Sequence, residues 1–75
     1  MTGTPLQLHA IRVEGGRGVV DEVRWELFAF HDVRDVLATD TPDVLMVIYR
    51  GEPQVPQWLE TLRAAGYTVA ANTGA

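Results

Sequence analysis

The chain has 75 residues, among them ten acidic side chains and six arginines but no lysine, cysteine or serine, and its formal net charge is −4 at pH 7. The missing residue types exclude disulfides, thiolate zinc sites, and serine, cysteine or lysine nucleophiles. Negative charge spread along the chain also disfavours nucleic acid as a partner, because phosphate binding requires clustered positive charge.

The length allows one domain, residues 1–75, with flexible tails expected at residues 1–4 and 72–75. A chain this short buries only about 60% of its unfolded surface, so small domains usually add a disulfide, a metal or a second subunit. Cysteine is absent, and two histidines are too few for a structural metal cage. We therefore expect no metal and no cofactor, and either very good packing of the single core or self-association.

No segment of the sequence predicts contact with a membrane. The longest apolar run, residues 44–49, is far shorter than the ~20 residues that span a bilayer. Residues 1–5 lack the charge and the apolar segment of a signal peptide. The sequence therefore predicts a soluble cytoplasmic protein.

The first half of the chain is predicted to form an antiparallel hairpin. Residues 6–14 alternate as a strand, residues 15–18 are a glycine-rich turn, and residues 19–30 read as a longer strand. This pairing places Leu8 opposite Trp25 and makes one face of the hairpin apolar and the other mostly polar.

The second half of the chain is predicted to alternate helices and strands. Residues 32–39 carry apolar side chains at helical spacing and precede a proline, which favours a short helix. Residues 44–49 are apolar throughout, as is typical of a central strand covered on both faces. A second helix is predicted at residues 56–65, with Gly66 as its left-handed cap, before a last strand at residues 67–71.

The resulting order, ββαβαβ, predicts an α/β protein on the border of the α+β class. Its four-stranded sheet is expected to be mixed, because the hairpin is antiparallel and helical crossovers make the later strands parallel. Right-handed crossovers in one direction place both helices on one face of the sheet. The alternative is a strand order that places one helix on each face.

On the face without helices, the predicted strand at residues 19–30 presents Arg24, Glu26, Phe28 and Phe30. Uncovered aromatic surface of this kind on a small protein usually marks an interface. We therefore predict a homodimer, or binding of a partner protein, through these four residues. If one helix covers each face instead, the two phenylalanines belong to the core.

A second cluster is expected where the parallel strands end, because ligands of parallel sheets bind at the carboxyl ends of the strands. The residues at these ends are His31, Asp32, Arg50, Glu52 and Asn72. His31 and Asp32 could exchange a proton, and Arg50 could bind an anion. Asp32 has a second interpretation as the N-cap of the predicted helix, which assigns no chemistry to it. No catalytic residue and no metal ligand is predicted.

The predicted uncovered face favours a non-enzymatic interaction module that self-associates. The alternative is a small ligand-binding domain or enzyme that uses the strand-end residues. A third hypothesis, an acidic mimic of nucleic acid, is weakened because arginines interrupt the negative charge throughout the chain.

Overall fold

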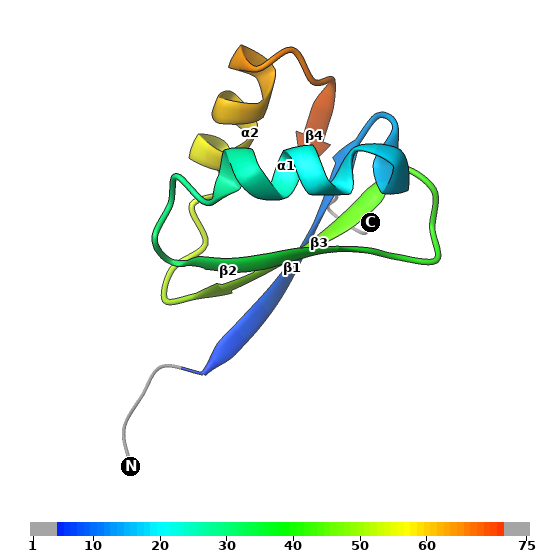
Figure 1. Ribbon diagram of the computed structural model, residues 1–75. Helices are drawn as coiled ribbons and strands as arrows, with labels where there is room; N and C mark the ends of the chain where they lie inside the picture. The colour runs from blue at the N-terminus through cyan, green and yellow to red at the C-terminus, as the bar shows by residue number, and fades with distance from the viewer. Residues whose placement is uncertain (1–4, 72–75) are drawn as a thin grey trace.

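The computed structural model describes residues 5–71. The tails predicted at residues 1–4 and 72–75 lie outside the described residues. In chain order the elements are β1 (Leu6–Val13), the 3-10 turn η1 (Gly16–Val19), α1 (Val20–Leu27), β2 (Val33–Ala38), β3 (Val44–Arg50), α2 (Val55–Ala64) and β4 (Val69–Ala71) (Figure 1).

The four strands form one antiparallel sheet in the order β2-β3-β1-β4. The predicted ββαβαβ order and the predicted parallel strands are therefore wrong. β3 lies between β1 and β2, so the two strands joined by α1 never touch. This β-α-β-β-α-β arrangement is the split β-α-β, or ferredoxin-like, topology of the α+β class.

Residues 20–27 form α1 and not a hairpin strand. Val23 and Leu27, four residues apart, are fully buried on its inner side, whereas Trp25 between them is 74% exposed. The spacing of these three residues fits a strand period as well as a helix period, and only burial separates the two. Two acidic side chains in the first turn favour the helix, because they meet the positive end of its dipole.

Residues 33–38 form β2 and not a helix. Val33 and Val36 are both buried, and this spacing of three residues normally indicates a helix. The pairing register of β2 with β3 shifts between Val33 and Asp35. Such a bulge inserts one extra residue, so two side chains three positions apart can point to the same face of a sheet.

The remaining elements lie close to their predicted positions. α2 begins at Val55 with a proline in its first turn, and β3 covers residues 44–50. Gly66 has a φ angle of 102°, and the chain folds back as the Tyr67 amide donates to the Leu62 carbonyl at 2.9 Å. This is the left-handed helix ending that a glycine after the last turn predicts.

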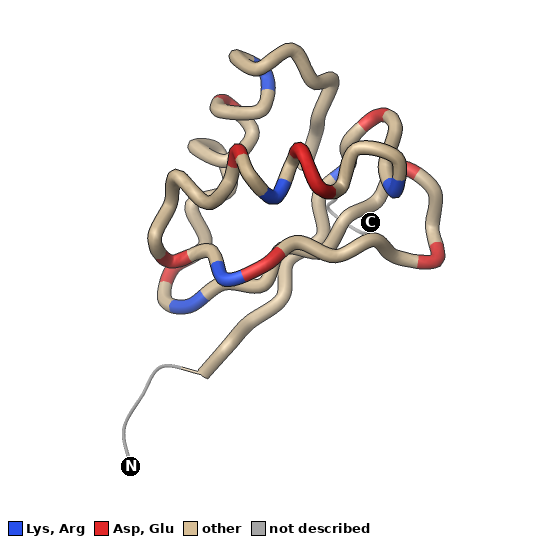
Figure 2. The backbone as a smooth tube through the Cα atoms, viewed as in Figure 1, with Lys and Arg blue, Asp and Glu red and all other residues tan. Residues whose placement is uncertain are grey.

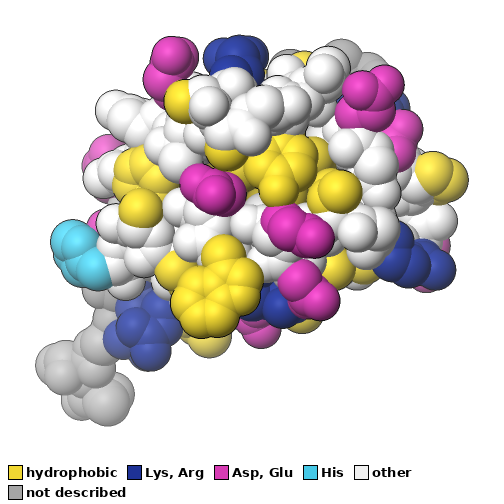
Figure 3. Space-filling model, turned by 45° about the horizontal axis from the view of Figure 1, so that its top comes forward, with side chains coloured by type: hydrophobic (Ala, Val, Ile, Leu, Met, Phe, Trp, Pro, Cys, Tyr) yellow, Lys and Arg dark blue, Asp and Glu magenta, His cyan; other side chains and the backbone are white. Residues whose placement is uncertain are grey.

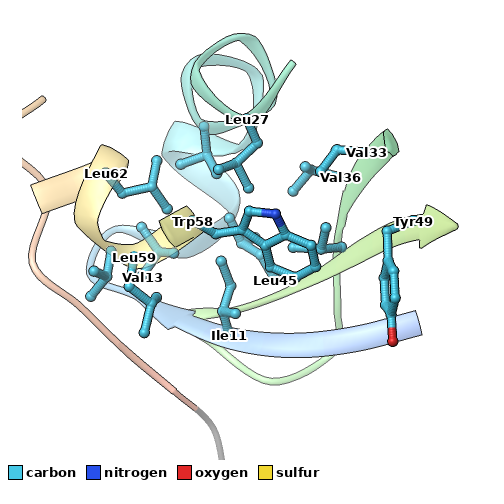
Figure 4. Packing of buried hydrophobic residues seen from close by; sticks show 13 residues of the cluster. Ile11, Val13, Leu27, Val33, Val36, Leu45, Tyr49, Trp58, Leu59 and Leu62 are labelled. Atoms are coloured by element: carbon cyan, nitrogen blue, oxygen red, sulfur yellow. The ribbon is translucent and has the colours of Figure 1, made fainter. Parts of the chain in front are cut away.

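Both helices lie on the same face of the sheet, as expected (Figure 1). The core fills the space between them and the sheet, with Trp58 of α2 at its centre (Figure 4). The Trp58 ring contacts Tyr49 of β3 edge to face, with ring centroids 5.3 Å apart. The core residues are Ile11, Val13, Val23, Leu27, Val33, Val36, Leu45, Val47, Tyr49, Trp58, Leu59, Leu62 and Val69.

Gly16 in the turn after β1 lies very close to the backbone of Asp43 in the loop before β3. Its φ angle is 42°, and a Cβ atom at this position would lie 2.6 Å from the backbone nitrogen of Asp43. The Val13 amide donates to the Asp43 carbonyl at 2.8 Å, and the Gly15 amide donates to Oδ1 of Asp43 at 3.2 Å. The loop before β3 therefore docks directly on the turn after β1.

This contact predicts that Gly16→Ala lowers the free energy of unfolding by about 2 kcal/mol, because a side chain there meets both a positive φ and a backbone atom. Gly18→Ala is the matched control, since nothing lies within 4 Å of its Cβ position. Urea unfolding of both variants measures the difference. Equal stability of the two variants would contradict the close approach of Gly16 and Asp43.

Candidate functional site

The face of the sheet opposite the helices carries a group of apolar side chains. Along β1, Ile11 and Val13 point to the core, so Leu6, Leu8 and Ala10 alternate to the opposite face. Leu8 pairs with Ile48 of β3. Ala10 pairs with Met46, which in turn pairs with Leu37 of β2. We call this group the helix-free patch; its members are Leu6, Leu8, Ala10, Leu37, Met46 and Ile48.

The patch is open to solvent where its side chains are largest. Leu6 is 54% exposed, Leu8 62% and Leu37 44%. Charged residues border it: Arg50 pairs with Leu6 at one end of β1, Arg12 lies at the other end, and Asp35 of β2 pairs with Ile48. The sequence also predicted exposed apolar side chains on the face without helices. The observed side chains are not the predicted phenylalanines, however, but aliphatic residues from three strands.

The residues predicted for the interface lie across the sheet from the patch. Arg24 and Glu26 belong to α1, and Phe28 and Phe30 follow it. Phe30 packs partly against the core, whereas Phe28 is exposed and contacts Trp25 edge to face at 6.0 Å between ring centroids. The prediction placed them on the helix-free face because it treated this segment as a strand.

Arg24 of α1 donates hydrogen bonds to β2, the strand at one edge of the sheet. Its Nε donates to Oδ1 of Asp35 at 2.7 Å, its Nη2 to the Val36 carbonyl at 2.8 Å, and its Nη1 to Oδ1 of Asp21 at 2.8 Å. Desolvation lowers the pKa of Arg24, but the hydrogen bonds and charges of the two aspartates outweigh it and raise the pKa. One guanidinium thus joins α1 to β2 and covers a strand carbonyl that would otherwise face solvent.

At the opposite edge of the sheet, the first half of β1 has, within the described part of the chain, no strand on its outer side. β4 pairs only with Ile11, Arg12 and Val13. Among the described residues no strand flanks residues 6–10 on that side, and β1 projects away from the sheet in Figure 1. The exposed leucines of the patch therefore lie beside backbone that has a neighbour on one side only.

Four of the five predicted ligand residues lie at the same end of the sheet. The Arg50 amide donates to the Asp32 carbonyl at 2.9 Å, because β2 begins where β3 ends. His31 is 96% exposed, with Nε2 at 3.4 Å from Oδ1 of Asp32. Glu52 is exposed in the loop after β3, and Asn72 lies outside the described residues. These groups share one end of the sheet through antiparallel pairing, and Asp32 precedes a strand, so its interpretation as a helix N-cap is wrong.

A hollow of about 360 Å³ lies at the opposite end of the sheet, between η1 and the loop before β3. It is lined by Gly15, Arg17 and residues 39–43. Its one guanidinium, on Arg17, already donates to the Thr39 carbonyl at 2.9 Å. Within residues 5–71 no group of three or more His, Cys, Asp or Glu side chains could hold a metal ion.

The outward side of α1 forms a second unusual surface. Trp25 and Phe28 are exposed there, next to Glu22 and Glu26. Desolvation raises the pKa of Tyr67 above its ordinary value, and the charges of Glu22 and Glu26 raise it further. The negative charges of these two carboxylates therefore act on the Tyr67 hydroxyl.

Comparison with protein-family models finds no match, and searches of curated proteins and of solved structures find none either. No helix in the described part of the chain is long and apolar enough to cross a bilayer. Because one topology can serve many unrelated functions, the surfaces of this chain must carry the functional conclusion.

The exposure of the patch predicts that its leucines contribute little to the stability of a single chain. Leu8→Ala should change the free energy of unfolding by less than about 1 kcal/mol, whereas Leu62→Ala should lower it by about 2–5 kcal/mol, since Leu62 is fully buried. Urea unfolding at a protein concentration where the particle is one chain measures both. A large loss in Leu8→Ala would show that the helix-free patch is covered within the monomer.

The position of Glu22 and Glu26 predicts that replacing both with glutamine lowers the pKa of Tyr67. Removing two negative charges makes the phenolate easier to form, while the contribution of desolvation keeps the pKa above its ordinary value. The ¹³C shift of the Tyr67 ring, followed above pH 9 by NMR, measures the change. Glu60→Gln is the control, because Glu60 does not contribute to the shift, and an unchanged Tyr67 in the double variant would contradict this arrangement.

Proposed function

We propose that the protein is a non-enzymatic interaction module that forms a homodimer through its helix-free patch. One observation carries the proposal: of the five large exposed apolar side chains among the described residues, Leu6, Leu8 and Leu37 share this face of the sheet. Contiguous apolar surface with charged residues only at its rim is typical of protein–protein contacts.

A second copy is the partner that best fits this surface. The core of the chain is built on one side of the sheet only. A domain of this size gains little from such a core, and burying the other face against an identical one adds a second apolar layer. Two-fold packing brings the same patch onto itself, so aliphatic side chains meet aliphatic side chains without needing a complementary charge.

The size of the chain is sufficient for this contact. A standard interface removes about 800 Å² of surface from each partner, which is roughly a sixth of the 4753 Å² that this chain exposes. The helix-free face is one of the two broad faces of the sheet. Its apolar centre supplies the favourable term, at about 25 cal/mol for each Å² of apolar surface removed from water.

The strand-end residues support ligand binding less well. The reason for expecting a site there was the parallel sheet, and this sheet is antiparallel. His31 and Glu52 are exposed at that end, outside the hollow between η1 and the loop before β3.

The proposal predicts a particle of twice the 8.3 kDa chain mass at micromolar concentration, measured by sedimentation equilibrium. Leu8→Glu should reduce it to one chain, because two carboxylates would be buried at the centre of the contact. Trp25→Glu is the matched control: it adds the same charge at an exposed apolar position on the helix side and should leave the mass unchanged.

Two further measurements complete this test, the salt dependence of the mass and the folding of the variant. Because each copy carries a net charge of −4, added salt should strengthen the association by screening the repulsion. Circular dichroism should show that the Leu8→Glu chain remains folded. A wild-type mass of one chain throughout the micromolar range would refute the dimer, and dissociation by Trp25→Glu alone would move the interface to α1.

A further inference from the structure

The helix side of the molecule exposes a tryptophan that the fold does not use. Trp58 is 1% exposed at the centre of the core, whereas Trp25 on α1 is 74% exposed. Tryptophan has a large apolar surface and is among the residue types that contribute most to binding when a partner covers them. Trp25 lies on the face of the sheet opposite the helix-free patch, so the proposed dimer leaves it in solvent.

The ring of Trp25 has an aromatic neighbour on the helix surface. Phe28 follows three residues later on the same side of α1, and the two rings contact edge to face at 78°. Residues three apart on a helix are surface neighbours, so this pair is set by the helix itself. A partner would therefore meet a pre-formed aromatic surface.

The charge around the aromatic pair is negative. Acidic positions lie along α1 with one arginine among them (Figure 2). That arginine, Arg24, is occupied by Asp21 and Asp35, and no ion pair among the described residues involves Glu22 or Glu26. Viewed from the helix side, hydrophobic side chains lie beside acidic ones (Figure 3).

Two like charges four residues apart repel each other along a helix. Glu22 and Glu26 have this spacing, and the charges of both raise the pKa of Tyr67. A cationic group placed beside Trp25 would relieve this repulsion and lie against an aromatic face at the same time. Anionic nucleic acid and anionic lipid are repelled by the same carboxylates.

We propose that the outward face of α1 binds an arginine-containing segment of a partner protein, with a guanidinium group stacked on Trp25 and its charge met by Glu22 and Glu26. Arginine fits better than lysine, because a planar guanidinium lies flat on an indole and still donates hydrogen bonds from its edge to carboxylates. The two faces of the sheet then bind different partners, a second copy on one and a basic segment on the other.

The test uses the full chain and two fluorescent peptides of equal length, oligoarginine and oligolysine, with binding followed by anisotropy. Oligoarginine should bind more tightly than oligolysine, and its affinity should fall as salt is added. It should also protect the wild-type fluorescence from acrylamide, since Trp25 is the accessible tryptophan and Trp58 is buried.

Variants locate the contact. Trp25→Ala should weaken oligoarginine binding roughly fivefold to tenfold, and Trp25→Leu should do the same, because leucine is apolar but offers no aromatic face. Glu22→Gln combined with Glu26→Gln should weaken it to a similar extent. The charge-matched control, Glu14→Gln combined with Glu52→Gln, changes two exposed acidic residues outside α1 and should retain the wild-type affinity.

Three results would overturn the proposal. Equal affinity of the wild type and Trp25→Leu would remove the stacking contact. Equal loss in the control double variant would reduce the binding to net charge alone. Equal affinity for oligolysine would remove the preference for a guanidinium. Circular dichroism of each variant should show that α1 is intact, because all five substituted positions on and off α1 are solvent-accessible.

Discussion

The antiparallel pairing of β1 with β3 is the contact on which the rest of the structure depends. It joins Leu6 through Arg12 to Arg50 through Val44 and places the two longest strands side by side at the centre of the sheet. Once β3 occupies this position, β2 can only pair on its far side, and α1 must cross over β3 to connect β1 with β2. Both helices then cover the same face, and every alternate side chain of the central strands is directed away from them.

This one-sided arrangement accounts for both candidate surfaces. The covered face contains the whole buried cluster, with Trp58 inserted between the helices and the sheet. The uncovered face has aliphatic side chains on three neighbouring strands. A sheet face in contact with water usually carries polar side chains instead. On the helix layer, the inward side of α1 supplies Val23 and Leu27 to the core, while Trp25 is left outside it. The helix-free patch is thus the outer side of the sheet whose inner side is buried, and the surface around Trp25 is the outer side of α1 whose inner side is buried.

How much of this could be predicted from the sequence differs from segment to segment. α2 and β3 were predictable because proline, glycine and an uninterrupted apolar run mark them without any partner. For α1 and β2 the predicted types were wrong: a strand was predicted where α1 lies, and a helix where β2 lies. Val23, Trp25 and Leu27 fit a strand until the burial of each is known, and Val33 and Val36 fit a helix unless a bulge is present. The candidate surface was predicted as a helix-free face, but its residues were taken from the wrong segment, since Phe28 and Phe30 follow a helix.

By itself, the sequence determined the single small domain, the absence of disulfide and thiolate chemistry, the central apolar strand and the second helix, because composition and local conformational preference are properties of the chain alone. Only the tertiary structure decided which strands pair, which side of α1 is buried, and that Leu6, Leu8 and Leu37 share one surface. These features depend on contacts between residues far apart in the chain, such as Leu8 with Ile48, and local periodicity contains no information about which distant strand will lie alongside.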